Sequence, residues 1–151
     1  MSDPVQLLRF SIAGLQFALH LDSVHRVVRS VEVTPLPKAP ESVLGVINIQ
    51  GRIFPVFNIR KRFGIPDKEI DLTDQLIIAS TIRRTVVLLV DSISGVLERS
   101  RQEITKAEKI IPGTEYIEGV TKFKNGMILI HDLDTFLSLD EEKDLESAMK
   151  E

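Results

Sequence analysis

The sequence predicts an all-β protein that contains two similar small barrels, short helical turns and a C-terminal helix. Three observations lead to this prediction. Apolar and polar residues alternate along short segments, as they do in strands with one buried face. Turn-forming residue pairs separate these segments. The same order of segments occurs twice within the 151 residues.

The first half opens with a predicted β-hairpin, in which Ala13-Gly14 forms the turn after a strand-like run over 8–12. In the second strand, four alternating residues are expected to face the core: Leu15, Phe17, Leu19 and Leu21.

The rest of the first half is predicted from turn and breaker residues. Asp22-Ser23 is expected to cap a short turn that carries Val24, Val27 and Val28, and three prolines over 35–40 favour an extended connection. Strands are expected over Val43–Ile49 and Arg52–Phe57, and Pro55 suggests that the second is an edge strand or carries a bulge. A helical turn over Ile59–Phe63 should end at Gly64, before a linker over Ile65–Thr73.

The second half repeats this order. A hairpin is predicted over Gln75–Ser80 and Thr85–Val90, followed by a polar, irregular stretch over 98–114. Tyr116–Phe123 and Met127–Ile130 flank Lys124-Asn125-Gly126, and Asn-Gly is a strong hairpin signal. A helical turn should follow over Asp132–Leu139, and the charged residues 140–151 should form a helical or frayed tail.

Two short motifs support an internal repeat. The segment from Asp22 to Val28 recurs as Asp91 to Leu97, each time after the second strand of a hairpin. The pair Gly45-Val46 recurs as Gly119-Val120, each time at the start of a strand–turn–strand unit. Each half alone is marginal for an independent core, and two small barrels packed together would solve that problem.

Composition excludes several classes of function. The chain has no cysteine, which excludes disulfides, thiolate metal sites and a cysteine nucleophile and suits the cytoplasm. Its N-terminus does not resemble a signal peptide, and no apolar run is long enough to span a membrane. The net charge of −3 gives no reason to expect nucleic acid or anionic lipid as a partner.

No group of residues suggests catalysis. His20, His25 and His131 are not spaced as metal ligands, so a metal site would require His25 and His131 to meet in space. The sequence has no glycine-rich phosphate motif and no serine elbow. Asp132 and Asp134 are expected to cap a helical turn and face solvent. We therefore predict neither an enzyme nor a metal, nucleotide or organic cofactor.

The basic clusters at 60–62 and 83–84 raise the alternative of an oligonucleotide-binding barrel. That mode needs exposed aromatic residues interleaved with basic ones, and no such run is present. The cluster at 60–62 is expected to be the exposed face of a helical turn.

The remaining candidate is an apolar surface. The two repeated turns carry six apolar residues: Val24, Val27, Val28, Ile93, Val96 and Leu97. Either all six fill the seam between the barrels, or part of this surface is exposed and binds a helix of a partner.

Residues 45–60, GVINIQGRIFPVFNIR, resemble the core signature of CheW-like domains. Leu36-Pro37 before Pro40, the opening hairpin, and the pairs Val90-Asp91 and Gly119-Val120 also match, so the resemblance covers about residues 7–139. It implies two intertwined five-stranded SH3-like barrels in a single domain over 5–140. The first barrel would span approximately 15–70 and the second 74–139 plus exchanged strands, followed by a charged tail over 140–151.

The same resemblance implies a non-catalytic adaptor that couples chemoreceptors to a CheA-type histidine kinase. The kinase's CheW-like regulatory domain would associate end to end with a barrel. The cytoplasmic receptor tip, a helical hairpin, would lie in the groove between the barrels, so membrane contact would be indirect. The candidate partner-binding residues are Val24, Arg26, Val27, Val28, Asn48, Gln50, Gly51, Arg52, Ile93 and Val96.

The chain departs from the family pattern at two of these residues. Arg26 stands where the family commonly has Glu, and Gln50 stands where it commonly has Arg. We expect these positions to influence partner choice. A scaffold for a non-chemotaxis kinase pathway, such as pilus motility, is therefore an alternative function.

Overall fold

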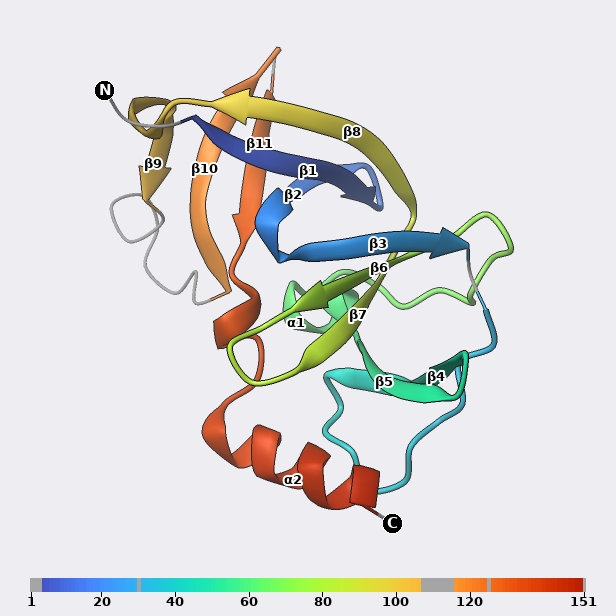
Figure 1. Cartoon of the computed structure of the whole chain (residues 1–151). Helices are drawn as coiled ribbons and strands as arrows, with labels where there is room; N and C mark the ends of the chain where they lie inside the picture. The colour runs from blue at the N-terminus through green and yellow to red at the C-terminus, as the bar shows by residue number, and fades with distance from the viewer. Residues whose placement is uncertain (1–3, 30, 107–115, 125, 151) are drawn as a thin grey trace.

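The computed structural model describes residues 4–29, 31–106, 116–124 and 126–150. The chain forms two sheets with a few short helical segments around them (Figure 1). Sheet 1 has the strand order β8 (Ser92–Arg99), β1 (Val5–Ile12), β2 (Leu15–His20), β11 (Gly126–His131), β10 (Ile117–Phe123), β9 (Ile104–Lys106). Sheet 2 has the order β3 (Val24–Arg29), β6 (Gln75–Ser80), β7 (Thr85–Val90), β5 (Arg52–Phe57), β4 (Val43–Ile49).

In the part of the chain that the structure describes, two helices and three 3-10 turns connect or cover the sheets. They are η1 (Leu21–Ser23), α1 (Ile59–Arg62), η2 (Arg101–Glu103), η4 (Leu133–Thr135) and α2 (Leu139–Lys150). The predicted fold class, mostly strands in two sheets with a C-terminal helix, is confirmed. Sheet 1 has six strands where five were expected, because the short strand β9 is added next to β10.

The two halves of the chain exchange strands. β3 leaves the opening hairpin and pairs antiparallel with β6 of the second half, and β8 returns to pair antiparallel with β1. The hairpins are also joined across the halves by two parallel pairs, β2 with β11 and β5 with β7. Neither half could therefore complete its sheet without the other.

The chain also links the two edges of each sheet. The outer strands of sheet 1, β8 and β9, are consecutive and are separated only by η2. In sheet 2 the connection after β3 runs to Thr34, which forms an isolated bridge with Val46 of β4. In both sheets, therefore, the two edge strands follow one another in the chain, β8 and β9 in sheet 1 and β3 and β4 in sheet 2.

Three apolar clusters hold the fold together. The largest, here called the shared core, joins residues of both sheets around Phe10, Phe17, Phe57 and Phe136, which are at most 1% exposed. Sheet 1 has its own smaller cluster around Leu7 and Ile128, and sheet 2 has one around Ile47 and Leu76. The family resemblance implied one core per barrel, and the shared core between the sheets adds a third.

The repeated glycines mark equivalent close approaches. A Cβ atom at Gly119 would lie 2.7 Å from the carbonyl oxygen of Thr105, and one at Gly45 would meet the carbonyl oxygen of Thr34 still more closely. In each case the segment that pairs with the outer side of the hairpin, at Thr34 or at Thr105, passes over the glycine. Each glycine also lies beside a register shift at the start of β4 or β10. The repeat seen in the sequence is thus a repeat of three-dimensional structure.

The predicted hairpins at β1–β2, β4–β5, β6–β7 and β10–β11 are confirmed. The turn residues Ala13 and Gln50 have positive φ values of 52° and 53°, and each precedes a glycine with positive φ. This is the geometry of two-residue turns that match the twist of the flanking strands.

Several local predictions are wrong. Val24–Val28 belong to strand β3 instead of a capped turn, because β6 offers a pairing partner from the other half. The stretch 98–106 contains the end of β8, η2 and β9, while the rest of the predicted irregular segment lies outside the described residues. Leu15 is 47% exposed at the start of β2, whereas Phe17 and Leu19 are buried as predicted.

Pro55 does not mark an edge strand. β5 lies between β7 and β4, and the register shift falls in β4, between Val43 and Gly45. The parallel pairing of β5 with β7 begins only at Val56, so the missing N–H of Pro55 precedes that pairing.

The C-terminal helix α2 packs against the shared core through Leu145, which is 0% exposed, and Ala148 of the same helix is 5% exposed. Two ion pairs also hold it in place, Glu141 with Arg62 of α1 and Glu142 with Arg84 of the β6–β7 turn. Figure 1 shows α2 below β4 and β5, at the end of the molecule away from β8. The charged C-terminal segment is thus a docked helix with one buried side.

Candidate partner-binding surface

The candidate residues form two groups. Val24, Arg26, Val27 and Val28 lie in β3, and Ile93 and Val96 lie in β8. These strands are the outer strands of sheets 2 and 1, respectively. Asn48, Gln50, Gly51 and Arg52 surround the β4–β5 turn, at the other edge of sheet 2.

Five of the six apolar residues of β3 and β8 divide among the three cores. Val24, Val27 and Ile93 are partly buried against the shared core. Val28 packs against the core of sheet 2, and Leu97 against the core of sheet 1. Val96 is 54% exposed. The outcome is therefore intermediate between a filled seam and an open apolar surface.

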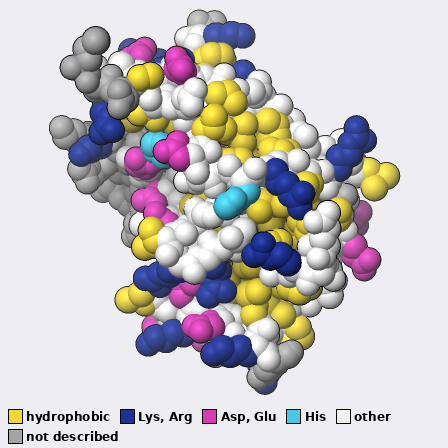
Figure 2. Space-filling model, in the orientation of Figure 1, with side chains coloured by type: hydrophobic (Ala, Val, Ile, Leu, Met, Phe, Trp, Pro, Cys, Tyr) yellow, Lys and Arg dark blue, Asp and Glu magenta, His cyan; other side chains and the backbone are white. Residues whose placement is uncertain are grey.

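We call the surface formed by Val24, Val27, Ile93 and Val96 the seam. Figure 2 shows hydrophobic side chains gathered over β8 and β1 and again beside β3, where Lys and Arg side chains border them. Val24 and Ile93 are equivalent in the repeat, as are Val27 and Val96. The seam is therefore bordered by two strands that occupy corresponding places in the two halves.

β3 and β8 also have bulges at equivalent positions of the repeat. The β3–β6 register shifts between Val24 and Arg26, and the β8–β1 register shifts between Ile93 and Gly95. Val27 then faces the shared core and Val28 the core of sheet 2. Because side chains alternate along a strand, Arg29 lies on the side of Val27, and Arg26 on the side of Val28.

Arg26 and Arg29 are both exposed. Among the described residues neither side chain has a hydrogen-bond or ion-pair partner. Arg29 was absent from the sequence-based candidates. Its alternation with Val27 could have indicated it, once the segment was recognised as a strand.

The β4–β5 turn forms an exposed tip. The side chain of Asn48 accepts a 2.9 Å hydrogen bond from the backbone N–H of Gly51, which fixes the turn. The guanidinium of Arg52 lies 5.1 Å from the ring centre of Phe54. Gln50 is exposed, and within the described part of the chain it makes no hydrogen bond to Arg26. The two positions that depart from the family pattern are thus not directly coupled.

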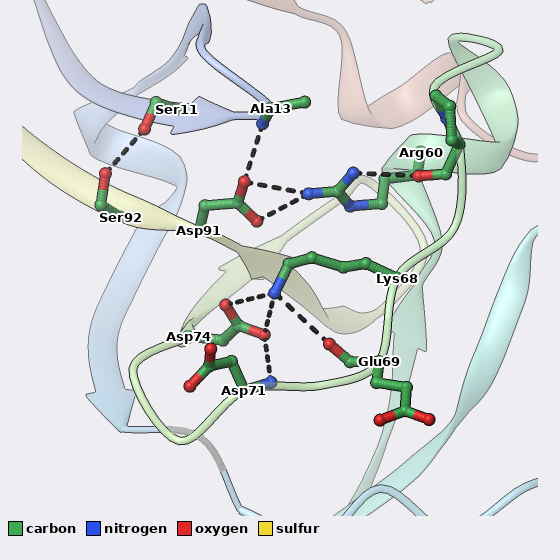
Figure 3. Close-up of polar contacts among 10 residues, drawn as sticks. Ser11, Ala13, Arg60, Lys68, Glu69, Asp71, Asp74, Asp91 and Ser92 are labelled. Carbon is green, nitrogen blue, oxygen red and sulfur yellow. Dashed lines mark hydrogen bonds and ion pairs between the residues drawn. The ribbon is translucent and has the colours of Figure 1, made fainter.

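A polar cluster at the junction of the two halves was not anticipated (Figure 3). Nη2 of Arg60 lies 2.9 Å from both carboxylate oxygens of Asp91, which also accepts a 2.7 Å hydrogen bond from the backbone N–H of Ala13. Beside it, Nζ of Lys68 lies 2.9 Å from both oxygens of Asp74, whose residue is only 3% exposed. This cluster joins α1, the β1–β2 turn, the 65–73 connection and the start of β8.

The prediction that residues 60–62 form an exposed basic face is wrong. The side chains of Arg60 and Arg62 are only 16% and 17% exposed. Arg62 pairs with Glu141 and lies over the rings of Tyr116 and Phe136. Only Lys61, at 52%, is largely exposed. These two arginines hold the fold together and are not available for phosphate groups.

The histidines occupy three separate environments. His20 lies 2.7 Å from Glu118, and this hydrogen bond raises the pKa of His20. His25 hydrogen-bonds to Ser80. His131 is 2% exposed among aromatic rings, and burial lowers its pKa to about 3. In the described ranges, no three His, Asp or Glu side chains gather as a metal site would require.

The paired carboxylates also have structural roles. Asp132 accepts a hydrogen bond from the backbone N–H of Asp134 at the start of η4, as the predicted helix cap should. Asp134 accepts a hydrogen bond from the backbone N–H of Ile82 in the β6–β7 turn. Partial burial raises the pKa of Asp132.

No helix in the described part of the chain is both long and apolar enough to cross a membrane.

Comparison with known proteins agrees with this architecture. Residues 6–141 match the CheW-like domain family. The chain is 30% identical to the chemotaxis protein CheW of Rhizobium meliloti, over 90% of this chain and 89% of that protein. It is also 30% identical to the chemotaxis protein CheW of Thermotoga maritima, over 87% of each chain.

The fold comparison gives the same result. The crystal structure of the scaffolding protein TtCheW from Thermoanaerobacter tengcongensis superposes with a TM-score of 0.83 at 29% identity. The match covers 92% of this chain and 96% of that one. The strand exchange, the internal repeat and the match over nearly the whole chain lead to one conclusion: this protein belongs to the CheW-like domain family.

Proposed function

We propose that this protein is a cytoplasmic, non-catalytic adaptor that couples chemoreceptors to a CheA-type histidine kinase. The observation that carries the proposal is the seam, where Val27 is partly buried against the shared core and Val96, its equivalent in the repeat, is exposed. Related proteins of the same length are named chemotaxis protein CheW, and the solved relative is described as a scaffolding protein. The receptor tip would bind at the seam through apolar contacts.

A second surface is needed for the kinase. The β4–β5 tip supports this role because it is an exposed end of sheet 2 whose turn is fixed by Asn48. Arg52 at this tip has no ion-pair partner among the described residues. An adaptor can hold two proteins at once only when its two binding surfaces are separate. Of the strands that border the seam, β8 belongs to sheet 1, and β3 lies at the edge of sheet 2 opposite to β4.

The oligonucleotide-binding alternative has no structural support. Four of the seven phenylalanines are fully buried in the shared core, and Arg60 and Arg62 are paired with carboxylates. Stacking of bases needs exposed rings beside unpaired cations.

The test compares Val96→Glu with Arg52→Glu. Val96 is preferred to Val27 because Val27 is partly buried, so a charge there would also destabilise the fold. Binding of each variant would be measured to a purified cytoplasmic receptor fragment and to a purified CheA-type kinase from the same organism. We expect Val96→Glu to weaken receptor binding about tenfold or more and Arg52→Glu to weaken kinase binding.

The matched control is Leu72→Glu, which places the same charge on a residue that is 93% exposed in the 65–73 connection. This variant should bind both partners like the parent. Failure of the parent protein to bind either fragment would refute the adaptor function. Equal loss of both partners in Val96→Glu would show that the two surfaces are not separate.

A further inference from the structure

The two strands that border the seam, β3 and β8, occupy corresponding places in the repeat but carry opposite charges at one pair of equivalent positions. β3 and β8 have equivalent bulges and equivalent apolar residues, as described above. The repeat that aligns Val27 with Val96 also aligns Arg29 with Glu98. The same alignment pairs Arg26 with Gly95. β8 therefore carries no cation at the position equivalent to Arg26.

Both charges are exposed and lie toward the seam. Alternation places Arg29 on the same side of β3 as Val27, and Glu98 on the same side of β8 as Val96. In the described residues Arg29 has no ion-pair or hydrogen-bond partner. The carboxylate of Glu98 accepts a 3.3 Å hydrogen bond from the neutral side chain of Gln6 and has no ion-pair partner among the described residues.

The other charged groups near β8 point elsewhere. The guanidinium of Arg9 lies 4.1 Å from the ring centre of Phe123, and that of Arg99 lies 5.8 Å from the same ring. Phe123 packs against the core of sheet 1, on the side of β8 away from the seam. Arg99 also donates a 2.9 Å hydrogen bond to the backbone carbonyl of Glu98, but neither Arg9 nor Arg99 forms an ion pair with the Glu98 carboxylate.

We propose that this reversed pair, Arg29 on β3 and Glu98 on β8, fixes the orientation of the helical hairpin that binds at the seam. The partner would carry an acidic side chain where it passes β3 and a basic side chain where it passes β8. This inference rests on the proposed function, because it takes the receptor tip as the occupant. A symmetric apolar surface could hold two antiparallel helices in either of two orientations. Opposite charges at equivalent positions make one of them attractive and the other repulsive.

The experiment exchanges the two charges. Arg29→Glu combined with Glu98→Arg keeps the net charge of −3 and every apolar contact, but it reverses the polarity of the seam. Binding to the purified cytoplasmic fragment of a chemoreceptor from the same organism would be measured at about 50 mM and at about 500 mM salt. We expect the exchange to weaken binding about tenfold at low salt and much less at high salt, because exposed charges are screened.

One further variant controls for charge, and a second measurement controls for folding. Arg83→Glu makes the same change of charge as Arg29→Glu in the exposed part of the β6–β7 turn and should bind the receptor fragment like the parent. Binding to the kinase should be unchanged in the exchanged variant, which shows that the fold is intact. Parent-like receptor binding by the exchanged variant at low salt would overturn this inference and leave the adaptor function standing. Absence of receptor binding by the parent would overturn both.

Discussion

The guanidinium of Arg60 in the first half of the chain holds the carboxylate of Asp91 at the start of β8, with both oxygens 2.9 Å from one nitrogen. Asp91 also holds the β1–β2 turn through Ala13, and Arg60 donates a 3.0 Å hydrogen bond to the carbonyl of Pro66. One ion pair thus fixes the point where β8 leaves β7 and crosses to the other sheet.

Removing this carboxylate should destabilise the protein. We expect Asp91→Asn to lower the free energy of unfolding by about 1.5–3 kcal/mol, because partly buried hydrogen bonds to charged groups are lost. Urea denaturation would measure the change. Lys61→Gln removes a neighbouring, exposed cation and should change stability by less than about 0.5 kcal/mol. Similar small effects of both substitutions would contradict the role of the Arg60–Asp91 pair.

His131 should make stability depend on pH. Its pKa is about 3 in the folded protein and 6.5 in the unfolded chain, so below pH 6.5 the unfolded state binds a proton that the folded state does not. Stability should therefore fall as the pH decreases, by about 2 kcal/mol from pH 7 to pH 5. In His131→Leu this contribution should disappear, and stability at pH 7 should change little because neither ring nitrogen has a hydrogen-bond partner among the described residues.

His20 provides the opposite control. Its pKa is raised by Glu118, so its stabilising contribution is present below pH 6.5 and is lost as the pH rises through the raised pKa. His20→Gln should therefore leave the loss of stability toward pH 5 intact. Unfolding curves of the three proteins between pH 5 and pH 8 would decide, and parallel curves for the parent and His131→Leu would disprove the assignment.

The repeated glycines should not tolerate alanine. We expect Gly119→Ala and Gly45→Ala each to destabilise the protein by about 1–3 kcal/mol, because the added Cβ would push against a backbone carbonyl of the crossing segment. Gly126→Ala is the control, since a Cβ there meets no atom within 4 Å. Thermal unfolding would compare the three variants, and equal midpoints would rule out the close approach.

Docking of α2 should depend on Leu145. Leu145→Ala is expected to reduce stability by about 2–4 kcal/mol, since the side chain is fully buried in the shared core. Leu139→Ala removes the same atoms from a residue that is 64% exposed in the same helix and should cost less than about 0.5 kcal/mol. If truncation at Leu145 has no larger effect than at Leu139, the helix contributes little to folding.

Restoring the family residues at Arg26 and Gln50 should change receptor binding. We expect Arg26→Glu to weaken binding, more at low salt than at high salt, because the exposed guanidinium is available to a partner carboxylate. Since these two side chains do not bond to each other, the effect of Gln50→Arg should simply add to it in the double variant. Binding titrations with the receptor fragment would measure all three. Parent-like affinity in every variant at low salt would mean that the two departures are neutral.

The sequence predicts the hairpins well because a hairpin depends on neighbouring residues. Gln50-Gly51 and Ala13-Gly14 supply the positive φ values that a two-residue turn needs, and the flanking strands pair in register. β3 could not be recognised in this way. Its partner β6 lies in the other half of the chain, and its bulge interrupts the alternation that identifies a strand.

The candidate surface was predicted only in part for the same reason. The apolar residues of β3 and β8 were identified because the repeat draws attention to them, but their division among three cores depends on the packing of both sheets. Arg60 looked exposed because its partner Asp91 is distant in sequence. Arg29 and Glu98 became comparable only when the two strands were seen to have the same bulge.

The exchange of β3 and β8 also sets an order for folding during synthesis. All strands of sheet 2 lie between Val24 and Val90, so that sheet can form once this part of the chain has left the ribosome. The β1–β2 hairpin is made earlier, yet β1 must wait for β8 and β2 for β11. The first strands to be translated are thus among the last to gain their outer partners, and until then the apolar side of the nascent hairpin needs protection from aggregation.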